Sequence, residues 1–441
     1  MLLYFCTMQR SESIPVQKIP DLKSKLVEFA REFELACILD SNAQFYLNRG
    51  NYSYRNYDLI AGFSYVSSGS DNINDFNEFR RINNKDDNWY LGYLSYDLKN
   101  ELENLSSSNN DMLEWPPIFF FKPDIQFLLI NNVINIKVNR SDVEISELID
   151  CLNLYEISQA NPSPIHLVPR ISRREYISSV NKIQEKIQKG YIYEMNFCQE
   201  FFNHSTIDPY SVYRNMNLHS PSPFSVFFKY IDKFLLSSSP ERFLKKVNSL
   251  IISQPIKGTA ARGSDRREDQ LLKNHLTGSV KERSENIMIV DLVRNDLSKI
   301  AQKNSVKVEE LCGIYSFPHV HQMISTVSAH LSTNSLNEII KATFPMGSMT
   351  GAPKIEAMKI IEKYESTKRG LYSGTVGYIS PGMNFDFNVV IRSLQYHASK
   401  KYLSYLAGGA ITALSDPEKE YEECLTKIYG IINAEQKVNY A

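Results

Sequence analysis

The sequence predicts an α+β fold built on large antiparallel sheets. Three apolar runs, at 375–379, 385–396 and 402–406, are separated only by short turn segments. Turns that short join antiparallel neighbours, because a parallel pair requires a crossover of about a dozen residues or more. Strand-like and helix-like segments also do not alternate strictly along the chain, which argues against a doubly wound parallel sheet.

The N-terminal part of the chain contains apolar runs rich in aromatic side chains, separated by polar turns. The runs with the alternation typical of strands are 60–63, 89–96 and 119–121. A polar, proline-bearing segment at 158–170 is typical of a connection between two parts of a chain. We therefore expect an N-terminal region over 1–157 and a second region over 170–437, within one intertwined structural unit.

The second region is expected to begin with a helix. Ser172 and Glu175 have the spacing of a capping box, and Gly190 is placed to end the helix. One apolar stripe is formed by Ile177, Val180, Ile183 and Ile187. A strand is expected over 191–202, and further strands at 234–236 and 250–254.

Composition limits the classes of function. The 441 residues are 43% hydrophobic, which is ample for a core, and 49 basic residues balance 50 acidic ones. A net charge of −1 gives no global field for nucleic acid or a membrane surface, so neither is expected as a partner. The six cysteines are scattered without metal-type spacing, as in reduced proteins. The sequence shows no signal peptide and no run of about 18 apolar residues, so we expect a soluble cytoplasmic protein.

The segment 255–259 is the first candidate for chemistry. Pro255 is expected to end the strand 250–254, and Gly258 permits a tight backbone path beside a ligand. Lys257 would then be held at a strand end, where a desolvated amine can act as a nucleophile. Two strands of one hairpin would bring Glu241, a possible general acid, close to Lys257. The alternative is an ordinary exposed lysine and a structural glutamate.

Two pairs of glutamates form the second candidate. Glu282 and Glu285 share a helix face with apolar residues, and Glu420 and Glu423 share one face of a helix that begins at Pro417. Carboxylates that face one cavity repel each other, and a divalent cation would remove that cost. Mg²⁺ is bound by one or two carboxylates together with water and ligand oxygens. Two solvated acid pairs are the alternative.

Three further segments have features of anion sites. Thr350 begins the segment 350–354 at a predicted helix start, where free N–H groups suit a carboxylate. Gly408 and Gly409 would let backbone amides approach a ligand closely, or would mark only a tight turn. Arg392 is predicted to lie inside an apolar strand, where it would require an anion; an edge position is the alternative.

Together these segments resemble the chorismate-utilising enzymes, the family of anthranilate synthase component I, aminodeoxychorismate synthase component I, isochorismate synthase and salicylate synthase. The resemblance runs through about residues 170–435. Its signatures are at 239–243, 282–296, 344–354, 391–393, 408–409 and 416–427. Weaker ones in the N-terminal part are at 38–41 and 92–97.

The resemblance implies a sandwich of the two sheets with helices outside. It also implies a Mg²⁺ site formed by Glu282, Glu285, Glu420 and Glu423, with Glu285 and Glu423 nearest the metal. The two carboxylates of chorismate would be held by Arg392, Tyr372, Thr350, Lys427 and the amides of Gly408 and Gly409.

Within the family, the residue at position 257 discriminates between activities. Aminodeoxychorismate synthases carry Pro-Ile-Lys-Gly-Thr, as this chain does at 255–259, whereas anthranilate synthases have alanine at the lysine position. Salicylate synthases can also carry this lysine, but water-adding members have a second lysine where this chain has Glu194. The departures from the family pattern are Glu194 for the usual glutamine of aminating members, Gln322 for a common histidine, Ala260 for a frequent arginine and Ala410 for a third glycine.

The resemblance implies amination of chorismate to 4-amino-4-deoxychorismate through a covalent adduct on Lys257, with Glu241 as the acid. The ammonia would come from a separate glutamine amidotransferase, in the synthesis of 4-aminobenzoate and folate. The alternative enzyme is anthranilate synthase component I, which releases pyruvate. A further alternative is a catalytically silent regulatory subunit, because 220–224 resembles part of a tryptophan pocket and implies a tryptophan-like effector in the N-terminal half.

Overall fold

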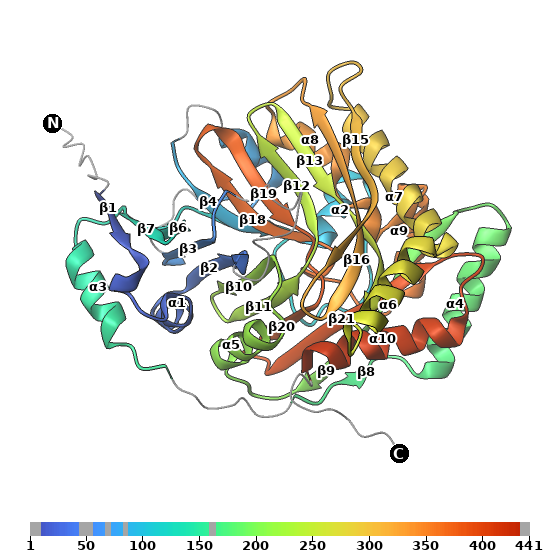
Figure 1. Cartoon of the computed structure of the whole chain (residues 1–441), viewed down its shortest axis with the longest axis horizontal. Coiled ribbons are helices and arrows are strands. Elements are labelled where there is room, and N and C mark those ends of the chain that lie inside the picture. Colours follow the sequence, from blue (N-terminus) through green and yellow to red (C-terminus); the bar gives the residue numbers. More distant parts are fainter. Residues whose placement is uncertain (1–9, 44–55, 67–71, 83–86, 158–164, 433–441) are drawn as a thin grey trace.

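The computed structural model describes residues 10–43, 56–66, 72–82, 87–157 and 165–432 (Figure 1). In this part of the chain the strands form one sheet of 12 strands and one of nine, and the paired strands run antiparallel throughout. The middle of the expected connection, residues 158–164, and the end of the second region, 433–437, lie outside the described residues. The α+β fold with large antiparallel sheets is thus confirmed.

The first sheet contains strands from both ends of the chain. In spatial order its strands are β1 (Arg10–Pro15), β7 (Val133–Val138), β6 (Ile125–Ile130), β3 (Leu59–Ser64), β2 (Leu35–Asp40), β10 (Phe224–Tyr230), β11 (Lys233–Ser239), β20 (Ser393–His397), β21 (Tyr402–Ile411), β9 (Glu194–His204) and β17 (Gly351–Ala352), with β8 (Val168–Pro169) paired to β9.

The second sheet carries the strands around Lys257. In order they are β14 (Ile256–Ala261), β16 (Val320–His330), β13 (Leu250–Gln254), β12 (Arg242–Val247), β19 (Asn384–Asn388), β18 (Thr375–Ser380), β4 (Tyr90–Leu94) and β5 (Ile118–Phe121), with β15 (Lys307–Ser316) paired to β16. Strands of the N-terminal region pair with later strands in both sheets, β2 with β10 and β4 with β18.

The two sheets pack against each other through apolar side chains. Tyr93 of β4 and Phe228 of β10, from different sheets, have ring centroids 5.3 Å apart. Successive residues of β2 alternate between this layer, which contains Leu35 and Cys37, and the core on the far side, which contains Ala36 and Ile38. This period of two is what a sheet with both faces covered requires.

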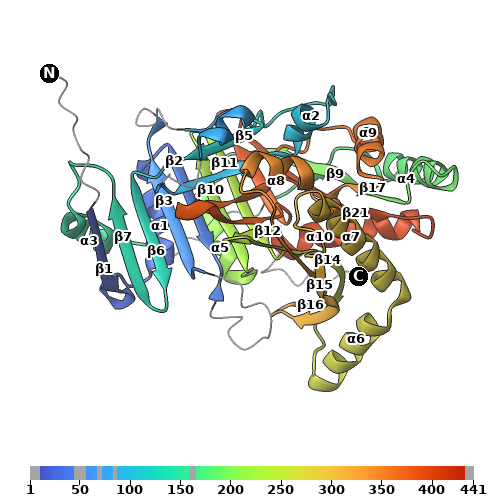
Figure 2. The same cartoon turned by 90° about the horizontal axis from the view of Figure 1, so that it is seen from above.

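Helices cover the outer faces of both sheets, as the family resemblance implied (Figure 2). The first sheet is covered by α1 (Leu22–Phe29), α3 (Ile145–Leu154), α5 (Pro209–His219), α4 (Arg173–Gln188), α9 (Lys354–Tyr364) and α10 (Pro417–Ile432). The second sheet packs with α6 (Arg266–Gly278), α7 (Val280–Ser298) and α8 (Leu336–Thr343), and α2 (Lys99–Leu102) is a single turn near β4. Across the described residues, no helix combines the length and apolarity that a membrane crossing requires.

Local sequence signals account for several of these elements. The capping box of α4 forms as predicted, with Ser172 accepting from the Glu175 amide at 3.3 Å and the Glu175 carboxylate accepting from the Ser172 amide at 2.8 Å. Gly190 has a φ of 77°, which suits the residue after a helix. Asp416 caps α10 through the Glu418 amide at 3.0 Å.

Two sequence predictions about strands were wrong. The run 385–396 is not one strand, because β19 lies in the second sheet and β20 in the first, so the chain crosses between sheets after Asn388. The run 234–236 belongs to β11 of the first sheet; the partner of β13 is β12, which begins at Arg242. The crossing after Asn388 occurs where apolar residues continue without a turn signal, and periodicity alone does not reveal which sheet they join.

Candidate active site

Lys257 lies in β14, directly after the break in the ladder at Pro255. Its side chain is half-buried, and the Asn286 amide of α7 donates to its backbone carbonyl at 3.3 Å and to that of Met323 at 3.2 Å. The next residue, Gly258, has a φ of 97°, and a Cβ there would lie 3.1 Å from a carboxylate oxygen of Glu282. Only glycine fits this position without strain, because the backbone conformation and the close approach of α7 both disfavour a side chain.

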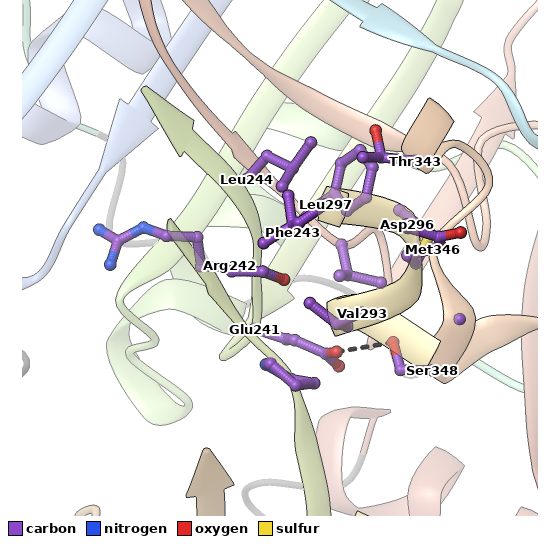
Figure 3. A pocket seen from close by; sticks show the side chains of 14 residues that line it. Glu241, Arg242, Phe243, Leu244, Val293, Asp296, Leu297, Thr343, Met346 and Ser348 are labelled. Atoms are coloured by element: carbon purple, nitrogen blue, oxygen red, sulfur yellow. Dashed lines mark hydrogen bonds between the residues drawn. The ribbon is translucent and has the colours of Figure 1, made fainter. Parts of the chain in front are cut away.

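Glu241 lies where the chain crosses from β11 to β12. It is only 3% exposed, and the Ser348 hydroxyl donates to its carboxylate at 2.7 Å (Figure 3). Burial raises the pKa of Glu241 to about 7, against the opposing effects of Ser348, of Lys257 and of the Ile256 backbone N–H. The small cavity beside it has a volume of about 20 Å³, room for about one water. Glu241 can therefore hold a proton near neutral pH.

The β12–β13 hairpin brings Glu241 close to the start of β14. Arg242 pairs with Gln254, so Glu241 and Pro255 lie just outside the two strand ends, and Lys257 follows two residues after Pro255. The electrostatic influence of Lys257 on the Glu241 pKa agrees with that geometry. The predicted hairpin between the runs 234–236 and 250–254 does not form; the strand that pairs with 250–254 is β12, which begins directly after Glu241.

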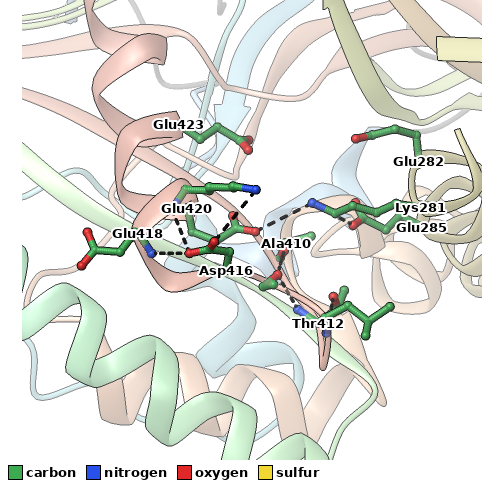
Figure 4. Close-up of polar contacts among 12 residues, drawn as sticks. Lys281, Glu282, Glu285, Ala410, Thr412, Asp416, Glu418, Glu420 and Glu423 are labelled. Atoms are coloured by element: carbon green, nitrogen blue, oxygen red, sulfur yellow. Dashed lines mark hydrogen bonds and ion pairs between the residues drawn. The ribbon is translucent and has the colours of Figure 1, made fainter. Parts of the chain in front are cut away.

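The two glutamate pairs lie on facing helices, α7 and α10, with Lys281 between them (Figure 4). The Lys281 ammonium is 3.8 Å from Glu285 of its own helix and 4.0 Å from Glu420 of α10. Glu285 is 8% exposed and Glu420 only 4%, so these two are not the solvated acids of the alternative interpretation. Glu282 is half-buried and Glu423 is exposed.

Burial and mutual repulsion change the acidity of these carboxyls. Burial raises the pKa of Glu285 to about 7, with Lys257 and Lys281 opposing the shift. The pKa values of Glu282 and Glu420 are also raised by burial, and the Glu423 charge adds to both shifts. Partial desolvation acts to raise the pKa of Glu423, whose side chain remains about half exposed, but its ion pair with Lys427, at 2.7 Å, outweighs this effect and lowers the pKa.

The carboxylate oxygens of these four glutamates are of the chemical type that binds Mg²⁺. One oxygen of Glu285 is buried without a hydrogen-bond partner, and carboxylate oxygens are the ligands that Mg²⁺ prefers. Among the described residues no three His, Cys, Asp or Glu side chains are already clustered as ligands. Because Mg²⁺ takes one or two protein carboxylates and keeps waters, opposed pairs on two helices suit it without such a cluster.

Three of the predicted substrate ligands, Gly408, Gly409 and Lys427, lie next to the acidic pair of α10. Gly408 and Gly409 are within β21, paired with Cys198 and Phe197 of β9, and do not form a turn. A Cβ at Gly409 would lie 2.9 Å from a carboxylate oxygen of Glu420, so this glycine makes room for the acidic pair. The Lys427 ammonium donates to the Gly408 carbonyl at 2.6 Å.

Thr350 and Tyr372 are both buried. Thr350 precedes α9, which begins only at Lys354, and its hydroxyl donates to the Met346 carbonyl at 3.1 Å. Burial holds the pKa of the Tyr372 phenol well above its usual value. Neither hydroxyl is a surface group, so each is placed to act only on a ligand inside the molecule.

Arg392 was predicted inside an apolar strand, and this prediction was wrong. It precedes β20 at the crossing between the sheets, with a φ of 52°, and its carbonyl accepts from the Ser238 amide at 3.1 Å. Its charge lowers the pKa values of both Glu241 and Tyr405 against the effect of burial. The crossing therefore places the Arg392 charge near enough to affect both groups.

Sequence reasoning missed the residues that hold this site in place. Ser348 and Asn286 act through the contacts given above. Arg369 is 1% exposed, pairs with Glu365 at 2.6 Å, and donates to the backbone carbonyls of Met349 and Asn196. Ser348 and Asn286 had no distinguishing signal, because their partners are distant in sequence; Arg369 and Glu365 have an i,i+4 spacing that could have suggested their ion pair. Lys281 was visible next to Glu282 but had been given no role.

A second cavity, of about 190 Å³, lies in the N-terminal half between α1, β2 and α5. Asp40 lines it and accepts from Lys23 at 2.7 Å, from the Asn42 amide at 2.8 Å and from Asn217 at 3.2 Å. The Asn42 side chain also donates to the Ser222 carbonyl at 2.9 Å, which ties the predicted effector segment 220–224 to this cavity.

Comparison with known proteins agrees with this geometry. Residues 37–433 match the family described as chorismate binding enzyme. The aminodeoxychorismate synthase component 1 of Klebsiella aerogenes is 33% identical, with 78% of this chain and 76% of that protein covered. The chloroplastic aminodeoxychorismate synthase of Arabidopsis thaliana is 36% identical over 78% of this chain, but the chain spans only 40% of the plant protein.

Among solved structures, the anthranilate synthase component I of Streptococcus pneumoniae is similar with a TM-score of 0.69. It is 26% identical, and the match covers 78% of this chain and 80% of that one.

Proposed function

Because the chain belongs to the chorismate-binding enzyme family, we propose that it aminates chorismate with ammonia to give 4-amino-4-deoxychorismate. The observation that carries the proposal is a buried acid, Glu241, whose pKa is about 7, which lies just outside the β12–β13 hairpin and is affected by the charge of the Lys257 amine of β14. The names of relatives such as the Klebsiella aerogenes protein support the same reaction.

The proposed reaction uses Glu241 and Lys257 in sequence. Glu241 protonates the departing ring hydroxyl, which leaves as water while the neutral Lys257 amine forms a C–N bond to the ring. Ammonia then bonds to the ring, and the bond to Lys257 breaks. The new ammonium returns a proton to Glu241, so the net change is exchange of hydroxyl for amine. The pyruvyl group is retained.

Mg²⁺ is the proposed cofactor, with Glu285 and Glu423 nearest and Glu282 and Glu420 behind them. When bound, it would neutralise and orient the ring carboxylate. Six groups are proposed to hold the two carboxylates of the substrate: Arg392, Tyr372, Thr350, Lys427 and the amides of Gly408 and Gly409. The Lys427 ammonium would exchange its contact with Glu423 for a substrate oxygen.

The ammonia is proposed to come from a separate glutamine amidotransferase, in 4-aminobenzoate and folate synthesis. The designation "component 1" of the Klebsiella aerogenes relative supports a partner subunit. We also propose that the N-terminal cavity binds a tryptophan-like effector, since its lining combines charged groups such as Lys23 and Asp40 with apolar side chains such as Leu59, which suits an amino acid with an apolar side chain. Thermal shift with L-tryptophan tests the effector: an unchanged melting temperature would contradict it.

The second candidate is anthranilate synthase component I, favoured by the likeness to the Streptococcus pneumoniae structure. A product assay with chorismate, Mg²⁺ and ammonium salt separates the two. The proposal predicts a nonaromatic amino product with pyruvate kept, whereas fluorescent anthranilate with free pyruvate would refute it.

The covalent step has its own test. Without ammonia, intact-mass measurement should detect chorismate minus water on the protein, and peptide mapping should assign it to Lys257. Lys257→Ala should abolish the adduct. The matched control is Lys303→Ala, because Lys303 is an exposed lysine in a turn after α7. An adduct that persists in Lys257→Ala would exclude this mechanism.

A further inference from the structure

Glu194 differs from the glutamine usual in the family, and the backbone around it is hydrogen-bonded to a neighbouring strand. It is the first residue of β9 and pairs with Ala352 of β17. The flanking amides of Tyr193 and Asn196 donate to the Ala352 and Thr350 carbonyls at 2.7 and 2.8 Å. The segment that contains Thr350 is therefore hydrogen-bonded to the backbone on both sides of Glu194.

The side chain of Glu194 is buried but lacks a complete set of partners. It is 2% exposed, and its Oε2 has no hydrogen-bond partner. Burial raises the Glu194 pKa, and the Lys257 charge opposes that shift. The charged groups that face it are Lys257 on β14 and Glu285 on α7. A buried acceptor without a donor is costly, so such a group in a native structure calls for an explanation.

The Lys257 charge affects the pKa of Glu194, although no ion pair or hydrogen bond joins the two side chains. Within the described chain, the Lys257 ammonium forms no ion pair within 4.0 Å and no hydrogen bond. Its charge nevertheless affects the pKa values of five carboxyls, those of Glu194, Glu241, Glu282, Glu285 and Glu423. In the proposed function Glu241 is the acid and the other three hold the metal. Glu194 is the only one of the five without a role.

We propose that Glu194 is the base that takes the proton from the Lys257 ammonium once chorismate has closed the site to bulk water. This inference rests on the proposed function. The Lys257 ammonium gives one proton to the Glu194 carboxylate, and the resulting amine forms the C–N bond while the hydroxyl leaves as water with the Glu241 proton. When ammonia displaces Lys257 as a neutral amine, Glu194 returns the proton. Every proton is conserved within the site.

The test compares wild type with Glu194→Gln, which keeps the shape and removes the base. The rate of adduct formation is measured by quenched intact mass, with chorismate and Mg²⁺ but without ammonia, from pH 6 to pH 9. Wild type should change little over the range in which Glu194 is ionised. Glu194→Gln has no internal base, so the proton must go to bulk solvent before chorismate binds, and the rate should rise with pH by up to about tenfold per pH unit.

Two further variants separate a base from a structural residue. Glu194→Asp, which keeps the carboxylate, should be slower but retain the flat pH profile of wild type. Glu185→Gln, on the exposed face of α4, should match wild type in both rate and profile. Chorismate affinity should be similar in all variants. Parallel pH profiles for wild type and Glu194→Gln would overturn the proposal, as would a loss of chorismate binding that accounts for the defect.

A readout that does not require turnover keeps the inference separate from the proposed function. Acetic anhydride labelling of Lys257 in the substrate-free protein, followed by peptide mass, should begin at lower pH in Glu194→Gln, because losing a nearby negative charge destabilises the ammonium. If wild type forms no adduct at all, the proposed function fails. If adducts form but Lys257 is labelled identically in both proteins, only the role of Glu194 fails.

Discussion

The Lys281 ammonium lies 4.0 Å from a carboxylate oxygen of Glu420, although the two residues belong to different helices. Burial lowers the pKa of Lys281, but the four glutamates around it outweigh burial and raise it. The protein thus neutralises part of its acidic cluster with a cation of its own. A divalent ion entering between α7 and α10 has to compete with that cation.

Lys281→Met should strengthen Mg²⁺ binding, because it removes the competing charge. We expect about tenfold tighter binding in calorimetric titration, and a larger rise of the melting temperature on adding MgCl₂ than in wild type. Without Mg²⁺ the variant should lose about 1 kcal/mol or less, since Lys281 is half exposed. Equal Mg²⁺ affinity in both proteins would contradict the competition.

The stability of metal-free protein should increase as the pH falls from 8 to 5.5. The pKa values of Glu241 and Glu285 are raised to about 7, against about 4.3 in an unfolded chain, so the folded state binds more protons between these values. This contribution is complete at low pH and is lost as pH rises through 7. Comparing melting temperatures with Glu241→Gln/Glu285→Gln isolates it: the double variant should have a flatter profile than wild type.

Glu241→Gln should reduce amination by about 100-fold or more, because the leaving hydroxyl loses its proton donor. The amide can still accept the Ser348 hydrogen bond, so folding should be retained and thermal stability at pH 8 should not decrease. Steady-state kinetics with ammonium salt provide the measurement. Glu185→Gln again serves as the exposed control, and normal turnover in Glu241→Gln would remove Glu241 from the mechanism.

Gly258→Ala should destabilise the protein by at least about 1 kcal/mol, because the residue has a left-handed φ and its Cβ would press on Glu282 and Met323. Gly278→Ala is the matched comparison: it lies at the end of α6 and its Cβ would meet nothing within 4 Å. Urea unfolding should show a loss only in Gly258→Ala. The same loss in both would mean that the strain at position 258 is unimportant.

A structural feature was predictable from the sequence when the residues that determine it lie within a few positions of each other. The α4 helix was predicted correctly because Ser172 and Glu175 satisfy each other within one turn. The acidic pairs were visible because an i,i+3 spacing puts two carboxylates on one helix face. Arg392 was misplaced because continuous apolar residues gave no sign that the chain leaves one sheet for the other.

By itself, the sequence determined the α+β class, the strand break at Pro255, the capped helices and the residues that resemble the chorismate-utilising enzymes. Only the tertiary structure decided that α7 faces α10 across Lys281, that the β12–β13 hairpin brings Glu241 close to the start of β14, and that Glu194 is buried with one carboxylate oxygen unpaired. The physical reason is the separation along the chain over which each interaction acts. Caps, turns and periodicity act within a few residues, whereas burial and charge pairing depend on segments that meet only when the two sheets pack.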